Sequence, residues 1–298
     1  MDNYIIYTDS ACDMPHHVYE EYDVRVIPMD YLVNGESFTF HTESPDHDKE
    51  CDALFEAQRN DADVATTQIT PFVYIESFTP LLKEGKDILY VCFSSGLSAT
   101  FDNASIAVKQ LSEEFPDRKI IVVDSISATQ GQGILTYSAL LNRANGMSIE
   151  ENAAWLEEKK KYVCHRFMVG DLHYLKKGGR VSGAAAAIGS VLSIKPLLII
   201  KYDGKLEVCD KPRGEKMAVK RLIDNTKKNL GVEGVPKIFY VGHTSRYEDV
   251  KKVIEQLREA VGDEYTIEPV NLSPIIGSHV GPSFFSICGY GLDRNHSK

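Results

Sequence analysis

Hydroxyl side chains gather at two places where a strand-like run of this chain gives way to a helical pattern. Ser94 and Ser95 follow the apolar run 88–93, and Thr66 and Thr67 follow a second such run. Hydroxyl groups, together with the free backbone N–H groups of a helix N-terminus, donate hydrogen bonds to an anion. Because no His or Lys adjoins the serines, the pattern favours binding of an acidic head group over an activated nucleophile. Capping of the two helices that follow, with Ser98 and Thr70 as the N-cap residues, is the alternative interpretation.

The elements around these junctions predict an α/β fold with a largely parallel sheet in the first half of the chain. Strand-like runs alternate there with helical segments, a pattern typical of parallel strands joined by crossover helices. The runs cover residues 4–8, 24–29, 88–93 and 120–123. In such sheets, ligands bind at the carboxyl ends of the strands. If the strands that lead to the two hydroxyl clusters are neighbours, both clusters face one crevice.

The length of the chain predicts two domains, because 298 residues exceed the usual limit for a single hydrophobic core. The second half mixes strands and helices and contains a hairpin signal at Asp203-Gly204. Ser148 and Glu151 form a capping box that starts one more helix of the first half. We place the boundary after that helix, which gives domains 1–162 and 163–298. The last strand is expected to return near the crevice between them.

The composition argues against several classes of function. A formal net charge of −10 argues against nonspecific binding of nucleic acid, which needs a basic face. Six scattered cysteines without a C-x-x-C pair indicate reduced thiols and predict a cytoplasmic protein. The first residues carry no basic and apolar leader, so we expect no signal peptide. Lys195-Pro196 interrupts the most apolar stretch, 184–200, which therefore does not predict a membrane span.

Searches for catalytic and cofactor motifs find no complete site. Gly96-Leu97-Ser98-Ala99-Thr100 lacks the second glycine of a nucleophile elbow. Gly131-Gln132-Gly133 does not complete a dinucleotide fingerprint and is better explained by close packing of a helix on its neighbour. The spacing of His and Cys matches no zinc motif, and we expect neither metal nor cofactor. A serine-dependent acyl hydrolase or transferase, with His243 or His279 as base, remains the alternative to a binding protein.

Basic residues form two local clusters on this acidic chain. The first cluster flanks Gly178-Gly179 and the second follows the predicted hairpin; they consist of Lys176, Lys177 and Arg180, and of Lys211, Arg213 and Lys216. Each is either a solvated loop or a docking surface for an acidic partner or a phosphate. His279 lies among glycines, which permit close approach of a ligand. It is either a structural residue or a titratable donor to a bound carboxylate.

Seven motifs together resemble those of the DegV family, in the same order and over nearly the whole chain. They are Asp9-Ser10-Ala11-Cys12-Asp13-Met14-Pro15, the segment 66–71, Ser94-Ser95-Gly96-Leu97-Ser98-Ala99-Thr100, Tyr174-Leu175-Lys176-Lys177-Gly178-Gly179-Arg180, Ile194-Lys195-Pro196-Leu197, Lys211-Pro212-Arg213-Gly214 and His279-Val280-Gly281-Pro282. The third and fourth are quite specific in combination.

The resemblance implies a two-domain α/β fold that binds a long-chain fatty acid in a tunnel between the domains. Some members of the family are the acyl-binding subunit of bacterial fatty acid kinase. Such a subunit presents the bound carboxylate to a separate, ATP-dependent kinase subunit and has no catalytic activity of its own. The fatty acid is its ligand, no cofactor is implied, and transient contact with a membrane surface is compatible with the role.

Carried over to this sequence, the resemblance assigns residues to three roles. The carboxylate is assigned to Thr66, Thr67, Ser94, Ser95 and His279. The tunnel wall is assigned to Ala184, Ile188, Val191, Leu192, Ile194, Phe284 and Phe285, and contact with the partner or phosphate to Lys177, Arg180 and Arg213.

The sequence departs from the family pattern at two of these places. The segment Thr66-Thr67-Gln68-Ile69-Thr70 replaces a T-S-Q-P-S form, which keeps the hydroxyls and changes the stiffness of the loop. Phe284 and Phe285 stand where the family often has small residues. We therefore expect a shortened or bent tunnel and an altered chain-length preference.

Overall fold

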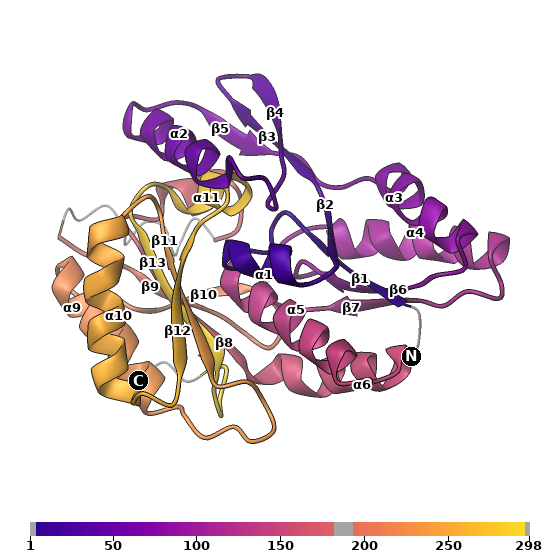
Figure 1. The fold of residues 1–298 in the computed structure, drawn as a ribbon. Helices are drawn as coiled ribbons and strands as arrows, with labels where there is room; N and C mark the ends of the chain where they lie inside the picture. The colour runs from indigo at the N-terminus through magenta and orange to yellow at the C-terminus, as the bar shows by residue number, and fades with distance from the viewer. Residues whose placement is uncertain (1–3, 182–192, 296–298) are drawn as a thin grey trace.

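The structure, a computed structural model, describes residues 4–181 and 193–295. The first of its sheets is fully parallel, with strand order β2-β1-β6-β7 (Figure 1). Its strands are β1 (Tyr4–Asp9), β2 (Val24–Ile27), β6 (Asp87–Cys92) and β7 (Ile120–Asp124). The predicted parallel sheet in the first half of the chain is thus confirmed.

Side chains of this sheet alternate between two helical layers, as the period of two in a strand requires. Tyr7 and Tyr90 pack on one face with α3 (Pro71–Lys83) and α4 (Thr100–Glu114). Ile6 and Leu89 pack on the other face with α5 and α6. Three further helices of this half are α1 (His16–Glu21), α5 (Thr129–Ala144) and α6 (Ile149–Lys159), and the predicted capping box of Ser148 and Glu151 starts α6.

A small antiparallel sheet with strand order β4-β3-β5 projects from the first sheet (Figure 1). It consists of β3 (Met29–Val33), β4 (Glu36–Phe40) and β5 (Val64–Thr66), and α2 (His47–Arg59) lies between β4 and β5 in the chain. We call residues 29–66 the cap. Asn34 and Gly35 form its hairpin turn with φ of 52° and 84°, the left-handed region that this dipeptide favours. The Asn34-Gly35 dipeptide alone indicates a hairpin, whereas the separation of this hairpin into a sheet of its own was not predicted.

The second half of the chain forms a mixed sheet with strand order β10-β9-β8-β13-β11-β12, in which β11 and β12 are the parallel pair. Its strands are β8 (Val163–Val169), β9 (Leu197–Ile200), β10 (Leu206–Asp210), β11 (Ile238–His243), β12 (Thr266–Asn271) and β13 (Phe284–Tyr290). The helices α9 (Glu215–Lys227) and α10 (Tyr247–Val261) cover one face. Shorter segments complete the fold: η1 (Lys160–Tyr162), α7 (His173–Lys177) and α11 (Pro274–Val280).

The helix α5 lies between the two large sheets and packs against strands of both (Figure 1). Its Gly131 and Gly133 allow this close packing. A Cβ atom on Gly131 would overlap the imidazole of His165, and one on Gly133 would overlap the backbone of Asp13. The predicted packing role of these glycines is confirmed. Among the described residues, no helix has both the length and the apolar character needed to cross a membrane.

Candidate functional site

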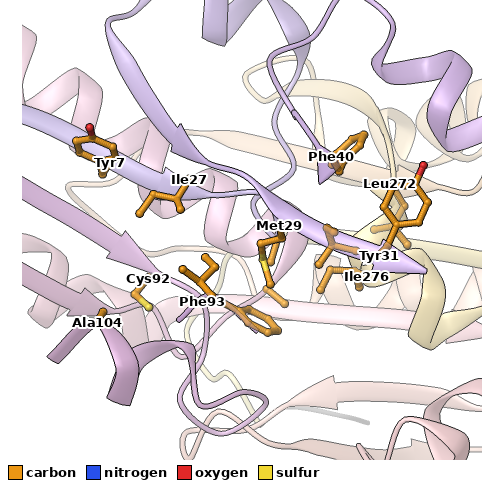
Figure 2. Packing of buried hydrophobic residues seen from close by; sticks show 14 of the residues in the cluster. Tyr7, Ile27, Met29, Tyr31, Phe40, Cys92, Phe93, Ala104, Leu272 and Ile276 are labelled. Atoms are coloured by element: carbon orange, nitrogen blue, oxygen red, sulfur yellow. The ribbon is translucent and has the colours of Figure 1, made fainter. Parts of the chain in front are cut away.

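A cavity of about 250 Å³ lies where the cap, the start of α4, α11 and the six-stranded mixed sheet meet. Its apolar wall includes Met29, Phe93, Phe167, Ile200, Ile276 and Phe284. Figure 2 shows Met29 of the cap, Phe93 at the end of β6 and Ile276 of α11 within one packed cluster. These residues come from distant parts of the chain, so the cavity exists only in the assembled fold.

A polar end of the cavity is formed by Thr66, Thr67, Arg180 and His279. Oγ1 of Thr66, at the end of β5, lies 2.8 Å from Nε2 of His279 in α11. On the other side of the ring, Gly178 packs so closely that a Cβ atom there would overlap Nδ1 of His279. The imidazole is therefore held between the cap and the loop after α7.

The electrostatics of this end favour a neutral imidazole beside a cation. Burial first, and the nearby Arg180 cation second, lower the pKa of His279 to about 4. Burial also lowers the pKa of Arg180, whose side chain is half-buried. The Arg180 guanidinium donates to the carbonyls of Leu97, at 3.2 Å, and Gly178. Because Arg carries five N–H groups, further donors are left for a ligand, and a carboxylate would match them.

The hydroxyls of the two serines predicted to hold a carboxylate are bonded to groups outside this polar end. Ser94 is buried, and its hydroxyl donates to the carbonyl of Gly204 at 2.9 Å, which ties the end of β6 to the β9–β10 turn. Ser95 is exposed and donates to Oδ2 of Asp124 at 2.5 Å. Neither serine is part of the described cavity wall. The physical reason is that both hydroxyls are already used to hold neighbouring loops together.

The segment after these serines reaches the cavity instead. Leu97, Ser98 and Ala99 line it immediately before α4 begins at Thr100. Ser98 was predicted to cap this helix, but the N-cap position is occupied by Ala99. The Ser98 hydroxyl accepts from the Thr100 N–H at 3.3 Å and lies 2.8 Å from Oγ1 of Thr100. The N-terminus of α4 thus adds partial positive charge beside the polar end.

The predicted tunnel residues divide into three groups. Phe284 lines the cavity. Phe285, the next residue of β13, points to the opposite face of the sheet, where Arg246 lies over its ring at 4.3 Å, because successive strand residues alternate. Ile194 pairs with Arg213 in an isolated bridge and is not part of the described cavity wall. The other four, Ala184, Ile188, Val191 and Leu192, lie outside the described residues.

Of the three basic residues predicted to meet a partner or phosphate, the structure brings only Arg180 to the cavity. Lys177 is exposed, forms an ion pair with Asp63 of the cap and also donates to the carbonyl of Val64. Arg213 is exposed at the start of α9. Lys177 and Arg213 therefore remain available at the surface, whereas Arg180 faces inward.

Sequence reasoning missed several residues that line the cavity, including Met29, Thr129 and His165. His165 of β8 is buried, and burial lowers its pKa to about 3, so the ring is neutral. No local motif marks these positions, since they reach the cavity only through the pairing of distant strands. Ser98 could have been assigned to the cavity, because it lies in the motif of residues 94–100, just before the predicted helix. Among the described residues, no group of His, Cys, Asp or Glu is arranged to hold a metal ion.

Comparisons with known proteins agree on one family. The family model of DegV matches residues 4–291. A DegV domain-containing protein of Clostridium perfringens is 34% identical over 284 residues, which cover 94% of this chain and 95% of that protein. A fatty-acid-binding DegV family protein of Thermus thermophilus is similar in structure, with a TM-score of 0.83 and 28% identity, covering 97% of this chain and 100% of that chain.

A second solved structure shows the same fold at lower identity. It is the fatty acid kinase B3 protein of Streptococcus pneumoniae loaded with linoleic acid, with a TM-score of 0.82 and 21% identity, covering 98% of this chain and 100% of that chain. The two-domain α/β architecture predicted from the sequence is therefore shared with solved structures.

Proposed function

The chain belongs to the DegV family. We therefore propose that it binds a long-chain fatty acid in the cavity between the cap and the six-stranded mixed sheet. The observation that supports this best is the pairing of Thr66 with His279 beside Arg180, at the polar end of an otherwise apolar cavity. The similar protein of Thermus thermophilus is described as binding fatty acid. In this proposal the carboxylate lies against Thr66, Thr67, His279 and Arg180.

The two ends of the fatty acid contribute differently to binding: the acyl chain supplies most of the affinity, and the head group sets the orientation. A chain of about sixteen carbons, buried at about 0.8 kcal/mol per methylene, contributes roughly 12 kcal/mol before ordering costs. Ordering and association costs of several kcal/mol still leave tight binding. The head group therefore mainly needs orientation. When the Nε2–H of His279 donates to Oγ1 of Thr66, the Thr66 hydroxyl stays free to donate to the carboxylate, and the Arg180 cation offsets the carboxylate charge.

We further propose that this chain presents the carboxylate to a separate ATP-dependent kinase subunit and does not itself catalyse a reaction. This step rests on the family resemblance of its motifs. The exposed Lys177 and Arg213 are suited to contact an acidic partner, and Arg180 can contact both the carboxylate and an incoming phosphate. The cytoplasm, where ATP and reduced thiols coexist, is the expected location.

The serine hydrolase alternative finds no supporting observation. The hydroxyls of Ser94 and Ser95 donate to a carbonyl and to a carboxylate, and neither is bonded to a histidine. A base within hydrogen-bond reach is what such a nucleophile needs.

Native mass spectrometry of the full chain, first stripped of lipid and then incubated with oleate, tests the proposal. We expect a one-to-one complex, and a weaker complex with the Arg180→Gln variant. Repeated failure to detect bound oleate in the folded protein would rule out the proposed function.

A further inference from the structure

A second cleft of about 390 Å³ lies apart from the first cavity and shares no lining residue with it. It is formed where the start of α1, the loop before α2, the start of α10 and the ends of β11 and β12 meet. Its volume falls within the range of small-molecule sites, which starts near 300 Å³. Nothing in the proposed fatty-acid site uses this cleft.

The position of the cleft is that of a ligand site in an α/β sheet. The parallel strands β11 and β12 end side by side, with His243 opposite Asn271, and both residues line the cleft. The carboxyl ends of adjacent parallel strands, beside the N-terminus of a following helix, are where such sheets bind ligands. Here the helix is α10, whose Tyr247 also lines the cleft.

Two polar groups of the cleft wall lack a partner among the described residues. Thr42 is fully buried, lines the cleft, and its Oγ1 makes no hydrogen bond there. His243 accepts the N–H of Arg246 on Nδ1 at 3.1 Å, so the neutral ring carries its proton on Nε2. Burial is the main cause that lowers the pKa of His243 to about 4, which keeps the ring neutral. No described residue accepts a bond from that Nε2–H. A buried hydroxyl without a partner is costly unless a ligand or water satisfies it, and the Nε2–H of His243 is a second donor of the same cleft wall.

The charged groups of the cleft are, in contrast, already paired. Asp48 lies 3.2 Å from Nδ1 of His47 and accepts from Asn271 at 3.3 Å. Lys251 donates to Glu248 at 2.6 Å. The charged groups that line the cleft among the described residues are thus already compensated, and a neutral ligand needs no further charge there. Met14, Pro45, Val250 and Pro269 give the remaining wall an apolar surface.

We propose that this cleft binds a small uncharged molecule rich in hydroxyl groups, of about the size of a monosaccharide. A hydroxyl group both donates and accepts, so it can satisfy Thr42 Oγ1 and the Nε2–H of His243 together. The C–H faces of such a molecule pack against the apolar wall and the Tyr247 ring.

The test is a titration of the isotope-labelled full chain, followed by amide and imidazole NMR signals, with three pyranoses that differ in charge. The probes are D-glucose, D-glucosamine and D-glucuronate, which are neutral, cationic and anionic at neutral pH. We expect glucose to shift the signals of Thr42, His243 and Asn271 saturably, with an affinity about tenfold higher than that of either charged sugar. Absence of a saturable shift with glucose, or tighter binding of a charged sugar, would overturn the proposal.

Variants distinguish the cleft from nonspecific sugar contact. Thr42→Val keeps the side-chain shape but removes the hydroxyl, and is expected to weaken glucose binding by about fivefold. Thr42→Ser keeps the hydroxyl and should retain binding. Lys252→Met removes a charge that is paired with Asp249 on the same helix but does not line the cleft, and should leave glucose affinity unchanged. Equal affinity of the Thr42→Val and Thr42→Ser proteins would contradict the assignment. Oleate binding, measured on the same proteins, should not change.

Discussion

Oγ1 of Thr66 lies 2.8 Å from Nε2 of His279, although 213 positions separate the two residues in the chain. The bond joins the last strand of the cap to α11 and closes the polar end of the cavity. Neither residue belongs to the apolar wall. Changes at this pair should therefore affect the head group of a bound fatty acid and leave the acyl chain's surroundings intact.

Replacing Thr66 by Val tests the donor role of this hydroxyl. The variant keeps the branched shape of the side chain and removes one neutral hydrogen bond, which is worth about 1 kcal/mol. We expect oleate to bind about fivefold more weakly, as measured by isothermal titration calorimetry. Thr70→Val is the matched control, because Thr70 at the N-cap of α3 makes no side-chain capping bond and is not part of the described cavity wall. Equal losses in the two variants would count against the role of Thr66.

Replacing Gly178 by Ala tests whether the loop after α7 positions the His279 ring. The new methyl group would overlap Nδ1, so the ring must move away from Thr66. We expect weaker oleate binding, by severalfold, in a protein with an unchanged circular dichroism spectrum. In a His279→Ala background the methyl group has room, so Gly178→Ala should then weaken oleate binding only slightly. A loss of equal size in both backgrounds would show that Gly178 acts through the backbone and not through His279.

The lowered pKa of His279 predicts a pH dependence of stability. The unfolded chain protonates this residue near pH 6.5, whereas the folded chain does so only near pH 4. The unfolded state therefore binds more protons between these values, and the free energy of unfolding falls as the pH drops from 6.5 towards 4. The contribution is at most about 1.4 kcal/mol per pH unit. Urea titrations of the parent protein and His279→Gln should diverge in this window, and parallel curves would contradict the prediction.

Arg180 is one cause of that lowered pKa, which gives a separate test of its position. Removing the cation by Arg180→Gln should raise the pKa of His279 towards its usual value, as followed by the imidazole NMR signals. The same variant should bind oleate more weakly, because it loses the cation that the described cavity wall contributes at the polar end. Lys177→Gln removes an exposed cation that is paired with Asp63 and should change neither property. An unshifted His279 titration in Arg180→Gln would place the guanidinium farther from the ring than the structure does.

Local patterns predicted most of the fold because they depend on neighbours in the chain. The apolar run that ends at Cys92, the Asn34-Gly35 turn and the capping box at Ser148 each specify an element without help from distant residues. The assembly of the cap into a sheet of its own, and α11, were not predicted. The cap is stabilised by packing across the chain, and α11 is too short and too rich in glycine and serine to show a helical period.

The site was predicted in part, for the same physical reason. His279 and Thr66 were found through motifs, and the structure brings them together. Ser94 and Ser95 have the composition of a binding loop, but composition does not reveal that Gly204 and Asp124 already accept their hydroxyls. Phe284 and Phe285 are equivalent in sequence, and only the register of β13 with β8 decides which of the two faces the cavity.

That register predicts opposite consequences for the same substitution at adjacent positions. Phe284 lines the cavity, whereas Phe285 packs beneath Arg246 on the far face of the sheet. Phe284→Leu should open space at the cavity wall and shift the preference towards longer acyl chains, measured by competition between palmitate and longer saturated acids. Phe285→Leu should lower the free energy of unfolding by about 1–3 kcal/mol. It should leave the chain-length preference unchanged, because the smaller side chain leaves space in the hydrophobic cluster on the other face of the sheet and not in the cavity. A shift in preference with Phe285→Leu but not with Phe284→Leu would mean that the strand faces the cavity with its other side.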